Sequence, residues 1–118
     1  MNVRYIGRVI QHITPAQARQ LISTGKVDVI DVRNPDEWAT GHIAGARLVP
    51  LGELRAAPAK SIRRDNVLFI CAAGVRSETA ARLAVGLGLK KVYNLRGGTR
   101  GWTNAGLPLD TEVATIAV

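Results

Sequence analysis

Residues 67–71 (VLFIC) are the segment that most constrains the fold of this chain. The run is entirely apolar and does not alternate with polar residues, which predicts a strand covered on both faces, as in parallel sheets. Other short β-branched runs alternate with helical patterns along the chain. We therefore expect an α/β domain with a mostly parallel sheet.

The expected elements follow this alternation. Thr14 and Pro15 have the features of an N-cap and a first helical residue. Further strands are expected at residues 27–31, 47–49 and 91–95. Helices are expected at residues 16–24, 36–38, 51–54 and 77–87. Gly97 and Gly98 lack the glycine order of a phosphate-binding loop, so a tight turn is expected there.

The composition fits one domain over residues 1–118, with a core at about 5–108 and a C-terminal tail at 110–118. The net charge of +7 and the pI near 10.5 favour anionic partners. Nucleic acid is disfavoured because the basic residues are scattered and are not interleaved with aromatic ones. No run reaches the roughly 18 apolar residues of a membrane span. The N-terminal arginines argue against a signal peptide, so we expect a cytoplasmic protein.

Cys71 ends the most apolar strand, at the sheet edge where open α/β sheets bind ligands. The short loop that follows contains Gly74, so its backbone N–H groups can turn inward. The positive end of the next helix adds to them, which favours the thiolate. Arg76 supplies a planar cation suited to an oxyanion. These features predict a nucleophilic thiolate in an anion-binding loop.

A simpler interpretation stays open for both side chains. Free cysteine is among the most buried residue types, and Cys71 at the end of an apolar strand fits an ordinary core position. Arg76 alone fits a solvated residue in a first helical turn. With one cysteine and two histidines, the chain has too few such ligands for a zinc site built from them, and we expect no metal.

Three blocks of residues occur in a characteristic order. They are DVR at 31–33 with EW at 37–38 and GHIAGA at 41–46, CAAGVRS at 71–77, and LRGG at 95–98 with Trp102. The middle block resembles the active-site loop C-x-x-G-x-R-S of the single-domain rhodanese family of sulfurtransferases. The outer blocks are similar to the family's D-V-R…E-[WYF]…G-H-I-x-G-A and L-x-G-G-x-x-x-W segments. The resemblance covers roughly residues 5–108.

The resemblance implies a single rhodanese-like domain with a central five-stranded, mostly parallel sheet and helices on both faces. It implies that Cys71 takes a sulfane sulfur from thiosulfate or a similar anion, as a persulfide, and passes it to a thiol or cyanide. No cofactor is implied. The implied anion-binding loop comprises Ala72, Ala73, Gly74, Val75 and Arg76.

Four residues of the first block are expected to support the site structurally. Asp31 is expected to be buried and paired with backbone or with an arginine. Arg33 and Glu37 are expected to form a local ion pair. His42 is expected to be a hydrogen-bonded turn residue rather than a general base.

Other functions compete with direct turnover of thiosulfate. The chain is alternatively a relay module, whose Cys71 is loaded by a sulfur-relay partner docked on the basic surface. A cysteine-dependent phosphatase or arsenate reductase on the same scaffold is disfavoured, because four residues instead of five separate Cys71 from Arg76 and no second cysteine exists. Mercaptopyruvate is disfavoured as donor, since enzymes that use it typically have threonine at the position of Arg76. With one loop cation we expect modest thiosulfate turnover, by a monomer or small homo-oligomer.

Overall fold

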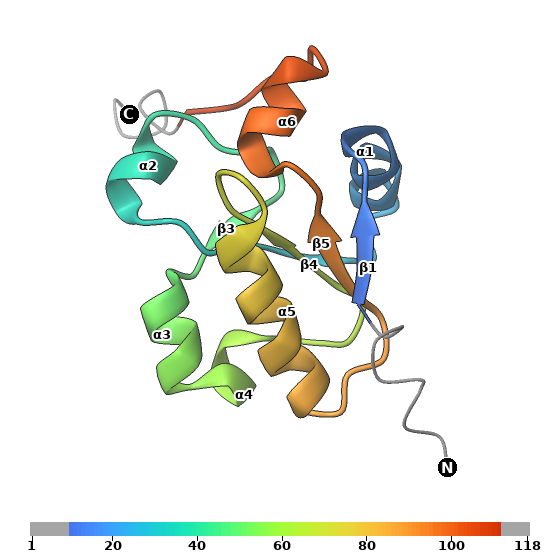
Figure 1. Ribbon diagram of the computed structural model, residues 1–118, viewed down its shortest axis with the longest axis vertical. Coiled ribbons are helices and arrows are strands. Elements are labelled where there is room, and N and C mark those ends of the chain that lie inside the picture. The colour runs from blue at the N-terminus through green and yellow to red at the C-terminus, as the bar shows by residue number, and fades with distance from the viewer. Residues whose placement is uncertain (1–9, 112–118) are drawn as a thin grey trace.

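The computed structural model describes residues 10–111 and shows a parallel α/β domain (Figure 1). Within these residues a five-stranded sheet has the order β1-β5-β4-β2-β3, and every neighbouring pair is parallel. Its strands are β1 (Ile10–Ile13), β2 (Asp28–Asp31), β3 (Arg47–Leu48), β4 (Val67–Ile70) and β5 (Val92–Leu95). The predicted fold class and the apolar central strand are confirmed.

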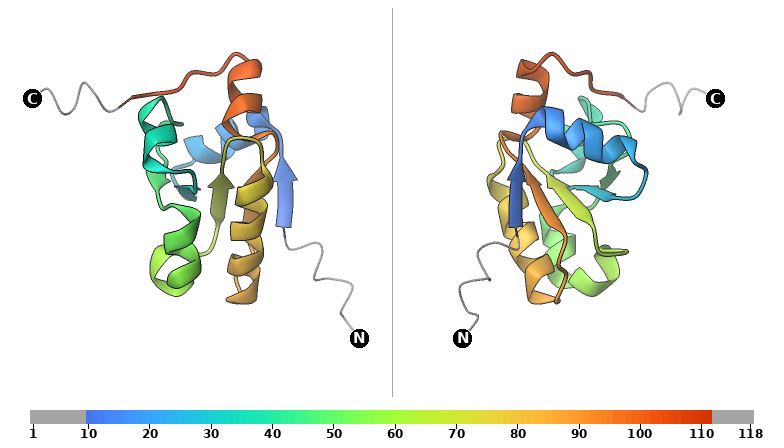
Figure 2. Two further views of the ribbon diagram at one scale, coloured as in Figure 1. Left: turned by 60° about the vertical axis from the view of Figure 1, so that its left-hand side comes forward. Right: turned by 90° about the vertical axis from the view of Figure 1, so that its right-hand side faces the viewer.

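Helices cover both faces of the sheet (Figures 1 and 2). They are α1 (Pro15–Ser23), α2 (Pro35–Ala39), α3 (Leu51–Ala56), α4 (Pro58–Ser61), α5 (Val75–Gly86) and α6 (Gly98–Asn104). Side chains of α3 and α5 pack with Val67 and Phe69 on one face, whereas α1 and α6 pack with Leu68 and Ile70 on the other. Successive β4 side chains thus point into different cores, which explains why this strand is apolar throughout.

The local signals in the sequence act as expected at the start of α1. The Thr14 hydroxyl accepts a hydrogen bond from the Gln17 N–H at 3.2 Å, and the Gln17 side chain accepts from the Thr14 N–H at 2.9 Å. This reciprocal capping box satisfies two N–H groups that the helix leaves without partners. The helix therefore begins at Pro15, where the sequence predicts it.

Three elements lack a sequence signal. β1 is an edge strand in which only Ile13 is buried, so its polar residues hide the strand pattern. α4 is a single turn in a segment for which the sequence analysis predicts neither a helix nor a strand. α6 begins at glycines, which are poor helix formers, and Trp102 anchors it by donating a hydrogen bond to the Pro108 carbonyl at 2.8 Å. Tertiary contacts decide all three.

The chain segment after α6 returns to the first block of the sequence. Asp110 and His42 exchange two backbone hydrogen bonds of 2.8 and 2.7 Å in an antiparallel bridge. Most of the tail expected at residues 110–118 lies outside the described residues, as does the expected start of the core near residue 5. Within the described part of the chain, no helix combines the length and the apolar character needed to cross a membrane.

Candidate active site

Cys71 lies directly after β4, at the carboxyl edge of the sheet. The loop from Cys71 to Gly74 connects this strand to α5 and passes beneath α6 (Figure 1). Gly74 has a φ of +100°, a left-handed conformation that side chains disfavour, and the helix begins at the next residue. The sequence pattern of strand, glycine loop and helix therefore positions the thiol as predicted, at the N-terminal end of a twelve-residue helix.

Two hydrogen-bonding groups contact the thiol. The Gly74 N–H donates to Cys71 Sγ at 3.0 Å, and Ser77 Oγ lies 3.2 Å from the same atom. Burial raises the pKa of the thiol, but hydrogen bonds from the Ser77 hydroxyl and from the backbone of Ser77, Ala73 and Gly74 outweigh burial and lower the pKa. Cys71 is only 1% exposed, as the core interpretation expects. Its polar contacts, however, are those of a site that stabilises a thiolate.

The backbone of the loop is oriented by its neighbours. The Thr99 N–H donates to the Cys71 carbonyl at 2.8 Å, and the Arg100 N–H donates to the Ala72 carbonyl at 3.1 Å. The Asn94 amide donates to the Gly74 carbonyl at 3.3 Å. These hydrogen bonds hold the loop in a conformation in which the Ala73 and Gly74 N–H groups face the thiol. Such a concave set of N–H groups binds anions.

Gly98 allows this close approach of α6. A Cβ atom at Gly98 would lie 2.5 Å from the carbonyl carbon and oxygen of Ala72 and closer still to the Cys71 carbonyl oxygen. Gly98 also has a φ of +60°, in the left-handed region. The expected tight turn is thus the first turn of a helix whose N–H groups bind the loop, a function that the glycine pair alone does not reveal.

Arg76, which the sequence analysis expects to bind an oxyanion, is paired with a carboxylate of the protein. Both terminal nitrogens of its guanidinium donate to the Glu37 carboxylate, at 2.8 and 2.9 Å. This bidentate hydrogen bond, with the Asn34 N–H, lowers the Glu37 pKa to about 2. Both side chains are about one-third exposed. The cation is therefore beside the loop but largely neutralised.

The expected ion pair between Arg33 and Glu37 is wrong. Asp31 is fully buried and accepts hydrogen bonds from Arg33 Nε at 3.0 Å and Nη2 at 2.8 Å, and Nη2 also donates to the Gly41 carbonyl. A buried carboxylate needs a buried cation, and Arg33 is only 4% exposed. Glu37 is thereby left free to bind Arg76 from α2.

His42 is buried behind this network. Its Nδ1 lies 3.2 Å from the Trp38 carbonyl, and its ring stacks on the Trp38 ring with centroids 3.6 Å apart. Both contacts join the His42 ring to Trp38 of α2. Within residues 10–111, no group of three or more His, Cys, Asp or Glu side chains is arranged to hold a metal ion.

Three residues of the site were given no role in the sequence analysis. Ser77 contacts the thiol and also donates to Asn94 Oδ1 at 2.5 Å. The Asn94 amide in turn lies 3.0 Å from His12 Nδ1. The sequence signal that could have identified Asn94 is an asparagine within an otherwise apolar strand, because a buried amide needs hydrogen-bond partners. The pairing of His12 with Asn94 depends on the register of β1, which was not predicted.

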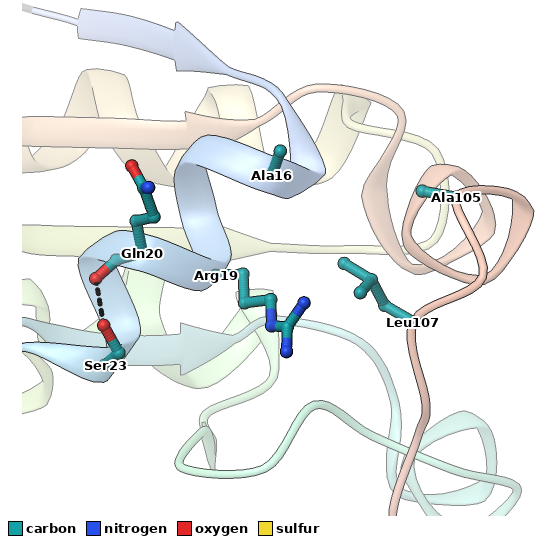
Figure 3. Close-up of a pocket in the computed structure, with 6 residues that line it drawn as sticks. All are labelled: Ala16, Arg19, Gln20, Ser23, Ala105 and Leu107. Atoms are coloured by element: carbon teal, nitrogen blue, oxygen red, sulfur yellow. Dashed lines mark hydrogen bonds between the residues drawn. The ribbon is translucent and has the colours of Figure 1, made fainter.

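A surface hollow of about 530 Å³ lies between α1 and the chain that follows α6 (Figure 3). Arg19 and Leu107 extend toward each other across it, and Ala16, Gln20, Ser23 and Ala105 complete its lining. None of the residues of the Cys71 loop contributes to this hollow. The candidate active site is instead a tight loop around one sulfur atom.

Comparison with known proteins identifies the family. A family model described as the rhodanese-like domain matches residues 14–105, which include the whole Cys71 loop and its neighbours in α2, β5 and α6. The chain belongs to the rhodanese family. The rhodanese blocks recognised in the sequence thus meet in space, where the first supplies Glu37, the second the Cys71 loop and the third Gly98.

Individual relatives match this rhodanese over most of its length. Thiosulfate sulfurtransferase GlpE of Pseudomonas aeruginosa (strain LESB58) is 35% identical over 102 residues, covering 86% of this chain and 91% of the relative. The putative sulfur carrier protein YrkF of Bacillus subtilis is 38% identical over 81 residues, covering 69% of this chain and 44% of the relative. A crystal structure of a rhodanese-related protein from Thermoplasma volcanium is 35% identical with a TM-score of 0.74, covering 85% of this chain and 97% of that one.

Proposed function

We propose that this rhodanese is a sulfurtransferase that carries a sulfane sulfur on Cys71 as a persulfide. The observation that supports this most directly is the arrangement around the thiol. The Gly74 N–H donates to Sγ, while the carbonyls of the same loop are bound outside by Thr99, Arg100 and Asn94. A loop of this kind stabilises negative charge on the thiolate and then on the outer sulfur of a persulfide.

The proposed reaction balances without a cofactor. The Cys71 thiolate attacks the outer sulfur of thiosulfate, so a new S–S bond forms while the bond within thiosulfate breaks and sulfite leaves with its electron pair. The persulfide then carries the negative charge on its outer sulfur, within reach of the loop N–H groups. A thiolate or cyanide attacks that sulfur and releases the Cys71 thiolate for the next cycle.

The relatives agree with this proposal in the chemistry their names state, which is thiosulfate sulfur transfer for GlpE. We infer a cytoplasmic location, where a thiol such as Cys71 stays reduced. The proposed partners are a small sulfur-containing anion and a thiol acceptor. No added group is needed by the residues of the site, since the loop itself supplies both nucleophile and anion binding.

Intact-mass spectrometry tests the proposal. Wild-type protein and Cys71→Ser are incubated with thiosulfate and then with cyanide. We expect wild type alone to gain the mass of one sulfur atom and to lose it after cyanide. If wild type gains no sulfur from thiosulfate or from any persulfide donor while its fold is intact, Cys71 is a core residue and the proposal is wrong.

A partner-fed relay is the second candidate function, and the Arg76–Glu37 pair favours it. A dianion such as thiosulfate gains little from a cation that Glu37 already neutralises, and the thiol is 1% exposed. A protein persulfide needs no such cation. Loading rates by thiosulfate and by a cysteine desulfurase that bears a persulfide separate the two, because a relay loads much faster from the protein.

Phosphatase chemistry is less well supported by the site. Four residues separate Cys71 from Arg76, and the guanidinium is bound to Glu37 rather than turned to the thiol. A phosphoryl group needs donors for three equatorial oxygens, and both terminal nitrogens of the Arg76 guanidinium already donate to Glu37. Hydrolysis of an aryl phosphate that Cys71→Ser abolishes would restore this alternative.

A further inference from the structure

A chain of hydrogen bonds, buried except at its His12 end, runs from the thiol to the edge of the sheet. Ser77 Oγ lies 3.2 Å from Cys71 Sγ and 2.5 Å from Asn94 Oδ1, and the Asn94 amide nitrogen lies 3.0 Å from His12 Nδ1. Ser77 is fully buried and Asn94 is 3% exposed, so bulk water does not replace the hydrogen bonds that Ser77 makes with Cys71 and Asn94. The proposed reaction uses the loop N–H groups and the Ser77 hydroxyl, and it leaves the contact between Ser77 and Asn94 without a function.

The orientation of the Asn94 amide is fixed by its other contacts. Its nitrogen donates to the Gly74 carbonyl and to His12 Nδ1, because an amide nitrogen can only donate and both of these atoms can accept. The amide oxygen must therefore face Ser77, where it accepts the hydroxyl hydrogen. His12 and Asn94 are register partners in β1 and β5, so the sheet itself keeps the two side chains together.

Ser77 has one hydroxyl hydrogen and two acceptors within reach. When Cys71 is a neutral thiol, its S–H can donate to Ser77, whose hydrogen then goes to Asn94. When Cys71 is a thiolate, Sγ needs that hydrogen, and Asn94 Oδ1 loses its donor in a buried position. An unsatisfied buried acceptor is costly. We propose that Asn94 is a positioning residue that competes with Cys71 for the single hydroxyl hydrogen of Ser77.

This competition changes through the proposed sulfur-transfer cycle, on which the inference rests. In the free thiolate the charge is on Sγ, whereas in the persulfide it is on the outer sulfur among the loop N–H groups. Ser77 can then return its hydrogen to Asn94. Asn94 therefore stabilises the persulfide relative to the free thiolate and keeps that thiolate more nucleophilic, since nucleophilicity rises with thiol pKa.

The ultraviolet absorbance of the thiolate, titrated against pH, tests the inference without any sulfur donor. Cys71 is the only cysteine in the chain, and Cys71→Ser provides the blank. Asn94→Val removes the competing acceptor, and valine is a residue that suits a β-strand. The titration midpoint of Cys71 should therefore fall by about 0.4 to 1 pH unit. Asn94→Asp keeps an acceptor in the same place and adds negative charge, so its midpoint should rise.

A Ser77→Ala background provides the control. Without the shared hydroxyl, Asn94→Val should leave the titration midpoint of Cys71 unchanged. Arg76, whose charge interacts with the thiol, remains paired with Glu37 in every variant. Equal shifts with and without Ser77 would mean that Asn94 merely shapes the loop, which overturns the inference. A midpoint that rises or stays constant in Asn94→Val also overturns it.

The same variants connect the inference to function through persulfide equilibrium. With thiosulfate and sulfite both present, the fraction of protein that carries the persulfide gives the equilibrium constant for sulfur transfer from thiosulfate to Cys71. In Asn94→Val this constant should be roughly twofold to tenfold smaller than in wild type. If wild type takes no sulfur at all, the proposed function fails while the titration still decides the role of Asn94. The two failures are therefore distinguishable.

Discussion

Gly98→Ala should damage the candidate site more than its fold. The new Cβ would lie 2.5 Å from the Ala72 carbonyl group, so the loop and the start of α6 must separate. Two hydrogen bonds hold them together, from the Thr99 N–H to the Cys71 carbonyl and from the Arg100 N–H to the Ala72 carbonyl. The loop would lose the contacts that direct its N–H groups toward the thiol.

The magnitude follows from two contributions. An L-residue in the left-handed conformation of Gly98 costs about 1–2 kcal/mol. The two hydrogen bonds contribute about 0.5–1.5 kcal/mol each. The free energy of unfolding should therefore fall by about 2–5 kcal/mol, part of a total that is about 5–15 kcal/mol for typical domains. Persulfide formation should slow by about 100-fold, since displacement of reacting groups by about 1 Å has effects of that size.

Gly25→Ala is the matched control for this prediction. Gly25 has a φ of +70°, close to that of Gly98, but a Cβ there would meet nothing within 4 Å. It should lose only the conformational part, about 1–2 kcal/mol, and load sulfur at the wild-type rate. Urea unfolding and the rate of persulfide formation measure both effects. Equal losses of stability in the two variants, with normal loading in Gly98→Ala, would refute the argument.

Three further predictions concern charge. Glu37→Gln removes the charge that neutralises Arg76, so the KM for thiosulfate should fall about fivefold in steady-state kinetics. An unchanged KM would mean that Arg76 does not bind the sulfur donor. Because the folded-state pKa of Glu37 is depressed to about 2, its contribution to stability is present above pH 4.5 and lost as the pH falls toward 2. Acid unfolding curves of wild type should therefore be steeper in that range than those of Glu37→Gln, and parallel curves would contradict this. Val75, the first residue of α5 beside the loop, is 74% exposed. Val75→Lys should therefore speed loading by thiosulfate and Val75→Glu should slow it, both at an unchanged Tm and both less strongly at high salt.

Sequence reasoning located the nucleophile because its signals are local. An apolar strand, a loop glycine and the start of a helix are each visible in adjacent residues, and together they specify where Cys71 lies. The partner of Arg76 could not be read in this way. Glu37 is 39 residues away, and the nearer Arg33 looked like its natural partner. The sequence does not reveal that Asp31 is buried and forms the ion pair with Arg33.

The three sequence blocks are separate in the chain because the loop needs support on three sides. Hydrogen bonds from the start of α6, where Gly98 allows a close approach, hold the Cys71 and Ala72 carbonyls, and this loop conformation directs the Gly74 N–H to the sulfur. The cation at the end of the loop must also be restrained, and Glu37 does this from α2. The remaining side is closed by Ser77 and Asn94, between α5 and β5. An isolated C-x-x-G-x-R-S sequence thus lacks the contacts that lower the pKa of its cysteine, which is why the motif predicts this chemistry only together with its outer blocks.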